Sequence, residues 1–431
     1  MSTFIKSFFK IGISKTIVII FSIATSILTA RTLGPEKNGI IAALLVYPSL
    51  FMTFGSLGIS QSVTFFIGKQ KYHEDNIKRA ITQIWAITSI LSLIICYLLI
   101  YSFTNVSNDF LLIILAILPI PFTLFNTYNM GLFLGKNEIS KYNQINWIPS
   151  ILIFFLSLVF ILNLKLDIKG AILATLGGSF SMSIILLLKN NFLSFFSVKI
   201  EWKLIKRLLS LGLIYALSLL VINLNYKIDV ILLDKLSTPF ELGIYSKGAS
   251  LTQYLWQIPM LLSTLVFAKS ATSKKDIEFS LKVAQLLRIS IFIIAIICLI
   301  LILFSKFIIL TMYGVQYKES VSVFVYLLPG VLLLTIFKVM NMDLAGKGKP
   351  WIALKAMIPA LIINIILNII LIPEKGANGA AIASTISYSI AAILFTFFYS
   401  KTSKVSIKQI FTYKKNDFKL FMSVFNKLMN K

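Results

Sequence analysis

The stretch Asn364–Thr385 reads NIILNIILIPEKGANGAAIAST. Its first part closes an apolar run that begins at Trp351, and its last part opens a second apolar run that ends at Tyr399. Only the short turn around Pro373 separates the two runs. A helix needs roughly 20 apolar residues to cross the hydrocarbon core of a bilayer. The stretch therefore predicts two membrane-spanning helices, Trp351–Ile372 and Gly379–Tyr399, joined by a tight turn.

The rest of the chain has the same apolar character. Hydrophobic residues make up 58% of the 431 residues, and the mean hydropathy is +0.89. A soluble core of this length could not hide so many apolar side chains, so the solvent must be lipid. Lipid cannot satisfy a bare backbone, and these runs are too continuous for barrel strands, so helices are required. Ten more spans complete a set of about twelve, which are Ile11–Ala30, Ile40–Ile67, Ala80–Phe103, Phe110–Leu134, Ile145–Asn163, Ala171–Leu188, Leu208–Leu233, Leu242–Phe267, Leu286–Phe304 and Val321–Leu344.

The lysines and arginines are distributed along the chain as in a membrane protein of defined topology. The chain carries 41 lysines and arginines and a formal net charge of +25. These cations form short clusters between apolar runs and not a stripe on a polar domain, which argues against a nucleic-acid partner. Most of them fall in the N-terminus, the even-numbered loops and the tail. By the positive-inside rule, both termini are predicted to face the cytoplasm.

The two halves of the sequence follow one plan. Gly170–Thr175 (GAILAT) corresponds to Gly379–Ser384 (GAAIAS), and Pro35–Gly39 corresponds to Pro239–Gly243 with the same Pro-to-Gly step. Six spans in each half give two repeats of the same orientation, related by an axis along the membrane normal, with a cavity at their interface. The prediction is an all-α membrane protein with two six-helix bundles and a basic cytoplasmic tail, over residues 1–200, 201–400 and 401–431.

Four segments carry a resemblance to a known family. They are LGPEKNG at Leu33–Gly39, LGIYSKGASL at Leu242–Leu251, AGKGKP at Ala345–Pro350, and the opening stretch Asn364–Thr385. At these residues the chain resembles the polysaccharide transporter branch of the MOP (MATE-like) superfamily, the Wzx-type O-antigen and polysaccharide flippases. The likeness runs from about Lys10 to Ser400.

The resemblance implies a function without catalysis. Two six-helix bundles would alternate in access around a cavity lined by the first, second, seventh and eighth spans. The substrate would be an undecaprenyl-diphosphate-linked oligosaccharide, moved across the bacterial cytoplasmic (inner) membrane for an O-antigen, lipopolysaccharide or capsule. The partners implied are this lipid-linked oligosaccharide, membrane lipids, H⁺ or Na⁺ as a coupling ion, and a polysaccharide polymerase with its chain-length regulator. No cofactor is expected.

Ionisable residues inside the spans are the candidate substrate site. Each costs about 2.5–3.5 kcal/mol at the bilayer centre on insertion scales, so such residues mark pathways or binding sites. Lys227, Lys247 and Lys338 qualify. At 1.5 Å per residue, Lys227 lies about 12 Å and Lys338 about 25 Å from the outer end of its span. Ammonium groups at more than one depth suit a diphosphate that is handed across the membrane. Arg31, at the outer end of the first span, joins this set.

The segment Asn223–Asp229 is too polar for a helix that faces lipid. Asn223 and Lys227 share one face at i, i+4 spacing, whereas Asn225 and Asp229 share another. We expect one face to line the cavity and to place Asn223 beside Lys227 for substrate binding. The other face would tie the helix to a neighbour, so Asp229 and Asn225 are assigned either to ion coupling or to structure.

Two alternatives remain. A glycan polymerase or ligase would need a sizeable outer loop with catalytic cations or histidine, but the longest predicted outer loop, Ser305–Ser320, has no histidine. The single histidine, His73, falls in a cytoplasmic loop. A MATE-like, cation-coupled multidrug antiporter would need acidic residues deep in its cavity, and the surplus of cations argues against it. Cys96 and Cys298 lie inside apolar runs and offer no metal site.

Overall fold

The computed structural model describes residues 2–105, 109–196, 201–257, 266–267, 269–270, 273, 276–414 and 417, with side chains from residue 12 on. Throughout these ranges the regular structure is helical, with no β-strand. The contacts divide the chain into two compact units, which are described separately. Unit 1 comprises Met1–Lys247 with Met312–Tyr317, and unit 2 comprises Gly248–Thr311 with Lys318–Lys431.

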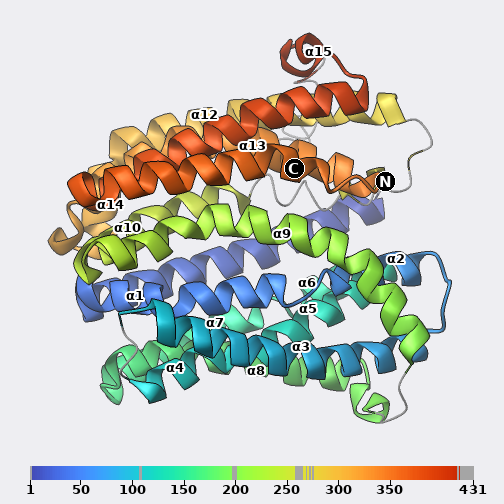
Figure 1. Cartoon of the computed structure of the whole chain (residues 1–431), viewed down its shortest axis with the longest axis horizontal. Coiled ribbons are helices and arrows are strands. Elements are labelled where there is room, and N and C mark those ends of the chain that lie inside the picture. Colours follow the sequence, from blue (N-terminus) through green and yellow to red (C-terminus); the bar gives the residue numbers. More distant parts are fainter. Residues whose placement is uncertain are drawn as a thin grey trace. The chain divides into compact units, whose positions relative to one another are not determined.

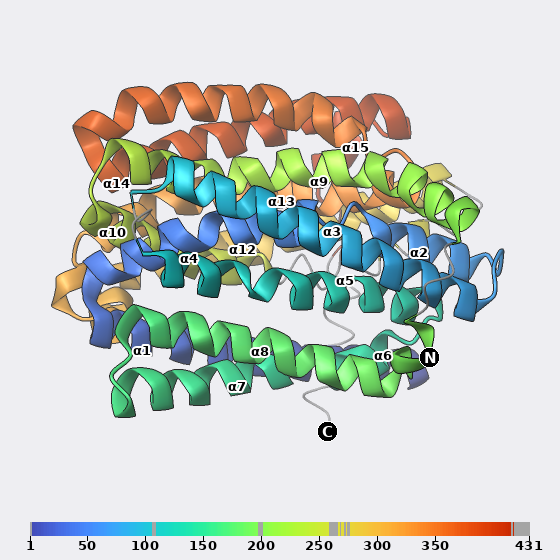
Figure 2. The same ribbon diagram turned by 60° about the horizontal axis from the view of Figure 1, so that its bottom comes forward.

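Unit 1 contains the helices of the N-terminal half and those that follow directly. They are α1 (Ser2–Phe54), α2 (Ile59–Gly68), α3 (Glu74–Phe103), α4 (Phe110–Ile117), α5 (Pro119–Gly135), α6 (Ile139–Asn143), α7 (Ile148–Ser157), the π-helix η1 (Leu158–Asn163), α8 (Asp167–Lys189), the 3₁₀-helix η2 (Phe192–Phe195), α9 (Trp202–Leu236), the start of α10 (Pro239–Leu255) and the 3₁₀-helix η3 (Val315–Tyr317). Figure 1 shows α9 running alongside α1, and Figure 2 shows α7 and α8 side by side.

Unit 2 contains fewer but longer helices. They are the end of α10, most of α12 (Asp276–Tyr313), then α13 (Ser320–Gly346), α14 (Ile352–Ser403) and the short α15 (Ile407–Phe411). α13 and α14 pack extensively on one another. The predicted boundary between residues 200 and 201 is drawn from the sequence repeat, whereas the two units are defined by contacts within the structure. The division into two six-helix bundles therefore stays a prediction.

Most of the predicted spans appear as long apolar helices. In the described ranges, nine helices are long and apolar enough to cross a membrane. Two of them, Gly12–Gly68 with 57 residues and Ile352–Ser403 with 52, have the length for two crossings each. Part of the eighth predicted span, Leu242–Phe267, lies outside the described residues. The class of all-α membrane protein is confirmed.

One predicted loop is wrong. The structure extends α12 to Tyr313 and follows it with η3, so the expected outer loop Ser305–Ser320 is largely helical. The apolar residues Phe307–Leu310 continue the helix beyond the length that a bilayer alone requires. Hydropathy finds the apolar centre of a span, but a helix continues as long as its backbone hydrogen bonds can form.

A tight turn at Gly34 and Pro35 divides α1 into its two spans. Gly34 adopts φ 76°, a left-handed conformation that suits glycine, and Pro35 follows without an N–H to donate. The buried side chain of Asn38 compensates, because its amide nitrogen lies 2.8 Å from the Thr29 carbonyl oxygen and 2.7 Å from that of Gly34. The same amide nitrogen lies 3.0 Å from the Tyr317 hydroxyl. The motif LGPEKNG therefore encodes both the turn and the group that satisfies its backbone.

The two Pro-to-Gly motifs of the repeat contact each other. A β-carbon added to Gly39 would lie 1.8 Å from the Pro239 carbonyl oxygen. One added to Gly243 would lie 1.9 Å from the Pro35 carbonyl oxygen. The carbonyl oxygen of each proline therefore packs directly against the glycine of the other motif. Small residues permit this close approach of helix backbones in a membrane. The contact brings the start of α10 against α1 inside unit 1.

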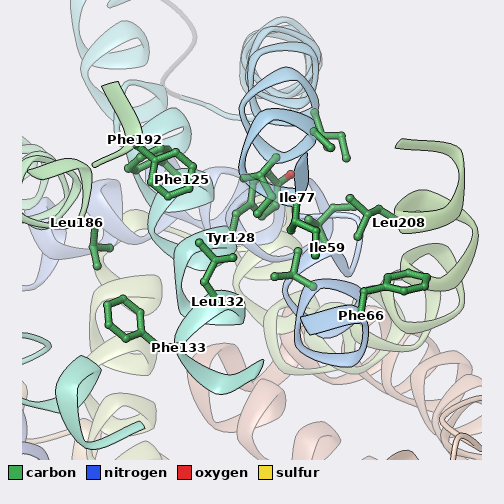
Figure 3. Packing of buried hydrophobic residues seen from close by; sticks show 14 of the residues in the cluster. Ile59, Phe66, Ile77, Phe125, Tyr128, Leu132, Phe133, Leu186, Phe192 and Leu208 are labelled. Carbon is green, nitrogen blue, oxygen red and sulfur yellow. The ribbon is translucent and has the colours of Figure 1, made fainter. Parts of the chain in front are cut away.

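A second backbone contact and an apolar core complete unit 1. A β-carbon on Gly212 of α9 would lie 2.3 Å from the Leu57 carbonyl oxygen, and the Ser62 hydroxyl donates to the Leu208 carbonyl at 2.8 Å. Around this junction, buried side chains from α2, α3, α5, α8, η2 and α9 form one cluster (Figure 3). Tyr128 lies at its centre and shares a hydrogen bond of 3.0 Å with Thr88.

In unit 2, a buried arginine anchors the tail. The Arg288 guanidinium of α12 donates to both carboxylate oxygens of Asp417, at 2.7 and 2.8 Å. It also donates to the carbonyl oxygens of Gln409 and Ile410 at 2.9 Å. These hydrogen bonds from Arg288 hold the pKa of the Asp417 carboxyl below its usual range. The start of the basic tail is therefore fixed to the N-terminal part of α12.

Alanine at either glycine of the reciprocal contact should destabilise the protein. Gly39→Ala or Gly243→Ala forces a methyl group onto a backbone carbonyl, and overpacking of this kind costs about 1–3 kcal/mol. The melting temperature of the purified protein in detergent should fall. Gly12→Ala is the matched control, because nothing lies within 4 Å of its added β-carbon. An unchanged melting temperature for both variants would contradict the contact.

Loss of the tail anchor should release the tail. Arg288→Met leaves a buried Asp417 carboxylate without its partner, a change that costs about 3–5 kcal/mol in buried pairs. Trypsin should then cleave after Lys414 much faster than in the unmodified protein. Lys282→Ala is the control, since its pair with Glu278 is exposed on both sides and is worth little. Equal cleavage rates for Arg288→Met and the unmodified protein would show that the tail is held by other contacts.

Candidate substrate-binding site

Six of the seven predicted site residues lie in unit 1. α9 carries Asn223, Asn225, Lys227 and Asp229, while Lys247 lies on α10 and Arg31 on α1. The four α9 residues sit well inside a helix of 35 residues. The helix is regular here, so the predicted sharing of faces between residues four apart applies.

Lys227 is the cation of this polar segment. It is half-buried on α9, and among the residues that the structure describes, its ammonium has no hydrogen-bond or ion-pair partner. Asn223, one turn earlier, donates its amide to its own helix, at 2.7 Å from the Leu219 carbonyl oxygen. Its side-chain carbonyl oxygen is left as an acceptor. This face of α9 therefore offers a cation and an amide oxygen one turn apart.

The other face of the segment is tied to a neighbouring helix. Asp229 is fully buried, and its carboxylate accepts a hydrogen bond of 2.7 Å from the Tyr245 hydroxyl of α10. Asn225, one turn earlier, is also fully buried. Asp229 thus links α9 to α10, as expected for one of the two faces. A role for Asp229 and Asn225 in ion coupling stays a prediction.

Lys247 bridges three segments of unit 1. Its ammonium donates to the Thr29 hydroxyl at 2.8 Å and to the Ser26 carbonyl oxygen at 3.3 Å, both on α1. It also lies 5.8 Å from the centroid of the Tyr313 ring. Only 8% of the Lys247 residue surface is exposed. This burial is deeper than snorkelling to the interface would give.

Arg31 follows two residues after Thr29, the α1 residue that Lys247 contacts, but has a different environment. Its side chain is exposed, and its Nε donates to the Met312 carbonyl oxygen at 3.0 Å. The adjacent Gln316 amide donates to the Ala30 carbonyl oxygen at 3.0 Å. These bonds fasten the end of the first span to the segment around Met312, so Arg31 acts as an anchor in this structure.

Lys338 lies in unit 2, on α13. Its ammonium is 4.1 Å from the centroid of the Trp256 ring, which follows directly after α10. Trp256, Tyr245 and Tyr313 could not be identified from the sequence, because nothing along the chain shows which aromatic ring will face which lysine or aspartate. Each comes from a different segment than the residue it contacts.

The buried carboxylate of Asp343 in unit 2 is surrounded by hydrogen-bond donors of the protein. The carboxylate of the fully buried Asp343 lies 3.0 Å from the ammonium of Lys347, four residues later at the end of α13. Its carboxylate also accepts hydrogen bonds from Ser270 and Ser280 at 2.6 Å and from Tyr399 at 2.7 Å. The charge and lone pairs of Asp343 are therefore satisfied by the protein. No group of three potential metal ligands occurs in the described portion of the chain.

The chain matches a known family over more than half its length. Residues 4–268 match the model of the family described as polysaccharide biosynthesis protein. The chain is 24% identical over 383 residues to the capsular polysaccharide biosynthesis protein CapF of Staphylococcus aureus, which covers 85% of this chain and 92% of that protein. It is 29% identical over 108 residues to the probable low-salt glycan biosynthesis flippase Agl15 of Haloferax volcanii, which covers 25% and 22%.

Solved structures show the same fold. An inward-facing multidrug resistance MATE family transporter of the MOP superfamily superposes with a TM-score of 0.74 at 17% identity, over 91% of this chain and 96% of that one. The lipid II flippase MurJ, in an inward closed conformation, superposes with a TM-score of 0.70 at 18% identity, over 98% and 99%. The chain therefore belongs to the polysaccharide biosynthesis protein family and has the fold of MOP-superfamily transporters.

Proposed function

We propose that this protein is a flippase for an undecaprenyl-diphosphate-linked oligosaccharide repeat unit. It moves the unit from the inner to the outer leaflet of the bacterial cytoplasmic membrane, by alternating access of two helix bundles and without a chemical change. The glycan then enters a surface polysaccharide such as an O-antigen or a capsule. In this proposal both termini lie in the cytoplasm, H⁺ or Na⁺ drives the cycle, and a polysaccharide polymerase receives the product.

The observation that carries the proposal is the ammonium of Lys227. A cation inside a span is retained only if something compensates its desolvation. Within the described residues no protein group does so for Lys227. An anionic ligand would supply the missing partner. A diphosphate fits this requirement, because its oxygens accept the hydrogen bonds that an ammonium donates.

The chemistry of the other cations supports the same substrate class. Lys247 contacts a hydroxyl, a carbonyl oxygen and an aromatic ring, and Lys338 contacts an aromatic ring. These groups are neutral, so these contacts do not themselves cancel the charge of the ammonium. A multidrug antiporter that binds cationic drugs would instead repel its ligand at these positions. The family match to polysaccharide biosynthesis favours a glycan carrier over a drug carrier.

Loss of the protein should trap the substrate on the inner leaflet. Cells that lack the gene should accumulate the complete lipid-linked repeat unit on the cytoplasmic face. An impermeant lectin or glycosidase, applied to spheroplasts and to inverted vesicles, would report the leaflet. Loss of a polymerase would instead leave single units exported to the outer leaflet. Repeat units that reach the outer leaflet at the normal rate, with no second flippase responsible, would refute the proposal.

Removal of either span lysine should stop export of the repeat unit. Lys227→Ala or Lys338→Ala deletes the charge that the diphosphate is proposed to meet, so surface glycan should fall at least tenfold while the protein level in the membrane stays normal. Arginine at either position should restore part of the glycan, because it keeps the charge but changes its geometry.

The control for these variants is Lys282→Ala. The Lys282 side chain is two-thirds exposed at the start of α12 and pairs only with Glu278 among the described residues. Its loss should leave surface glycan unchanged. Normal glycan in the double variant with alanine at positions 227 and 338 would remove both lysines from the substrate site.

A further inference from the structure

The segment that follows α8 in unit 1 is fastened along the side of α3. Residues 190–196 of this segment, which include η2, are called the connector below. The Lys78 ammonium of α3 donates to the Asn190 carbonyl oxygen at 3.1 Å. One turn further along α3, the Thr82 hydroxyl donates to the Phe195 carbonyl oxygen, also at 3.1 Å. Lipid could not satisfy these two carbonyl groups, so the hydrogen bonds from α3 allow the connector to lie within the membrane.

The connector follows α3 for about two turns. Its last residue, Phe196, packs on Trp85, with 6.0 Å between the ring centroids and 83° between the planes. Trp85 lies seven residues after Lys78, so the connector covers about 10 Å along α3 at 1.5 Å per residue. Phe192 anchors its middle, because its ring is fully buried and lies against Phe125 of α5 (Figure 3). Segments in the boundary between headgroups and acyl chains lie at a depth of about 5–10 Å.

Apolar side chains point outward from the connector and from the first turn of α9. Leu193 is 66% exposed and Phe196 is 48% exposed, while Trp202, which begins α9, is 67% exposed. Ile87 and Ile90 of α3 are exposed as well. Exposed apolar residues of a membrane helix face lipid, and tryptophan is enriched where the membrane meets water. These side chains therefore mark the level of the membrane interface.

The lipid-facing side of α9 ends in lysines. Leu217 and Ile214 are exposed apolar residues of this helix. The same face continues toward the start of α9 through Ser210, Lys206 and Lys203, at steps of three or four residues, and all three are exposed. One helix face thus passes from apolar residues, which suit acyl chains, to ammonium groups, which suit headgroups.

α8 ends in the same way. Ile184 and Leu188 are exposed one turn apart, and the exposed Lys189 ends the helix. Within the part of the chain that the structure describes, Lys189, Lys203 and Lys206 make no hydrogen bond or ion pair through their ammonium groups. Three exposed cations therefore surround the connector and are accessible to an anion.

We propose that the connector and the adjoining ends of α8 and α9 form a binding surface for anionic phospholipids. The exposed apolar side chains insert among the acyl chains, and the three ammonium groups bind phosphates of the headgroups. Charge complementarity favours this partner, because the sequence from Lys189 to Arg207 holds five lysines and arginines and one acidic residue, Glu201. The surface is independent of the proposed substrate, since it lies where α8 and α9 face the bilayer.

The test places a quencher in the lipid. The full-length protein and Trp202→Phe are reconstituted in phosphatidylcholine nanodiscs that contain an equal mole fraction of either brominated phosphatidylglycerol or brominated phosphatidylcholine. Bromine quenches tryptophan fluorescence at short range, so the difference between the two proteins reports the lipid beside Trp202. Brominated phosphatidylglycerol, the anionic lipid, should quench Trp202 more than brominated phosphatidylcholine does.

Removal of the three lysines should abolish this preference. Lys203→Gln alone should lower it by up to roughly fivefold, the factor expected for one cation beside an anionic membrane surface. The variant with glutamine at positions 189, 203 and 206 should show equal quenching by both lipids. The matched control deletes three exposed charges elsewhere and should keep the preference. Its substitutions are Lys282→Gln, Lys306→Gln and Lys375→Gln.

Three results would overturn the proposal. Equal quenching of Trp202 by the two lipids in the unmodified protein would exclude selection of the headgroup. If neither lipid quenches Trp202, the surface lies outside the bilayer, and water or a protein covers it. A preference that survives in the triple variant would show that other groups bind the lipid. Salt gives a second measurement on the unmodified protein, in which the preference should fall as exposed charges are screened.

Discussion

Unit 1 depends on a contact that contains no side chains. At Gly39 and at Gly243, a backbone carbonyl of the other motif occupies the space in which any other residue would place its β-carbon. Lipid offers little hydrophobic drive for helices to associate, so close backbone packing of this kind supplies much of the attraction. The turn at Gly34, capped by Asn38, directs α1 into the contact. The contact holds the start of α10 against α1, where Lys247 of α10 meets Ser26 and Thr29 of the first span.

The cations inside the protein have two kinds of partner. Lys347 and Arg288 meet carboxylates and fasten helix ends or the tail. Lys247 contacts a hydroxyl and a carbonyl oxygen, and Lys338 contacts an aromatic ring, all of which are neutral groups. Pairs of the first kind resist change, because breaking a buried pair leaves a bare charge. A contact with a neutral group has no second charge to strand when the contact is lost.

Much of the fold could be predicted because lipid sets helix length. The spans on both sides of Pro373 follow from apolar runs of about 20 residues, and the helix-end pair Asp343–Lys347 follows from i, i+4 spacing. The contacts Asp229–Tyr245 and Lys338–Trp256 could not be predicted, because each joins two helices whose relative rotation the sequence does not reveal. The helical course of α12 beyond Ser305 was missed because hydropathy does not record where backbone hydrogen bonds cease.

The exchanged glycine contact also limits how the sequence can drift. Most steric conflicts in a protein can be relieved by a smaller side chain on the opposing partner. At Gly39 and Gly243 the opposing atoms are carbonyl oxygens of Pro239 and Pro35, which every amino acid possesses. A genetic screen that starts from a larger residue at one glycine has no local suppressor to find. Compensation has to arise elsewhere, by moving a whole helix, so the two Pro-to-Gly motifs keep each other's smallest residue.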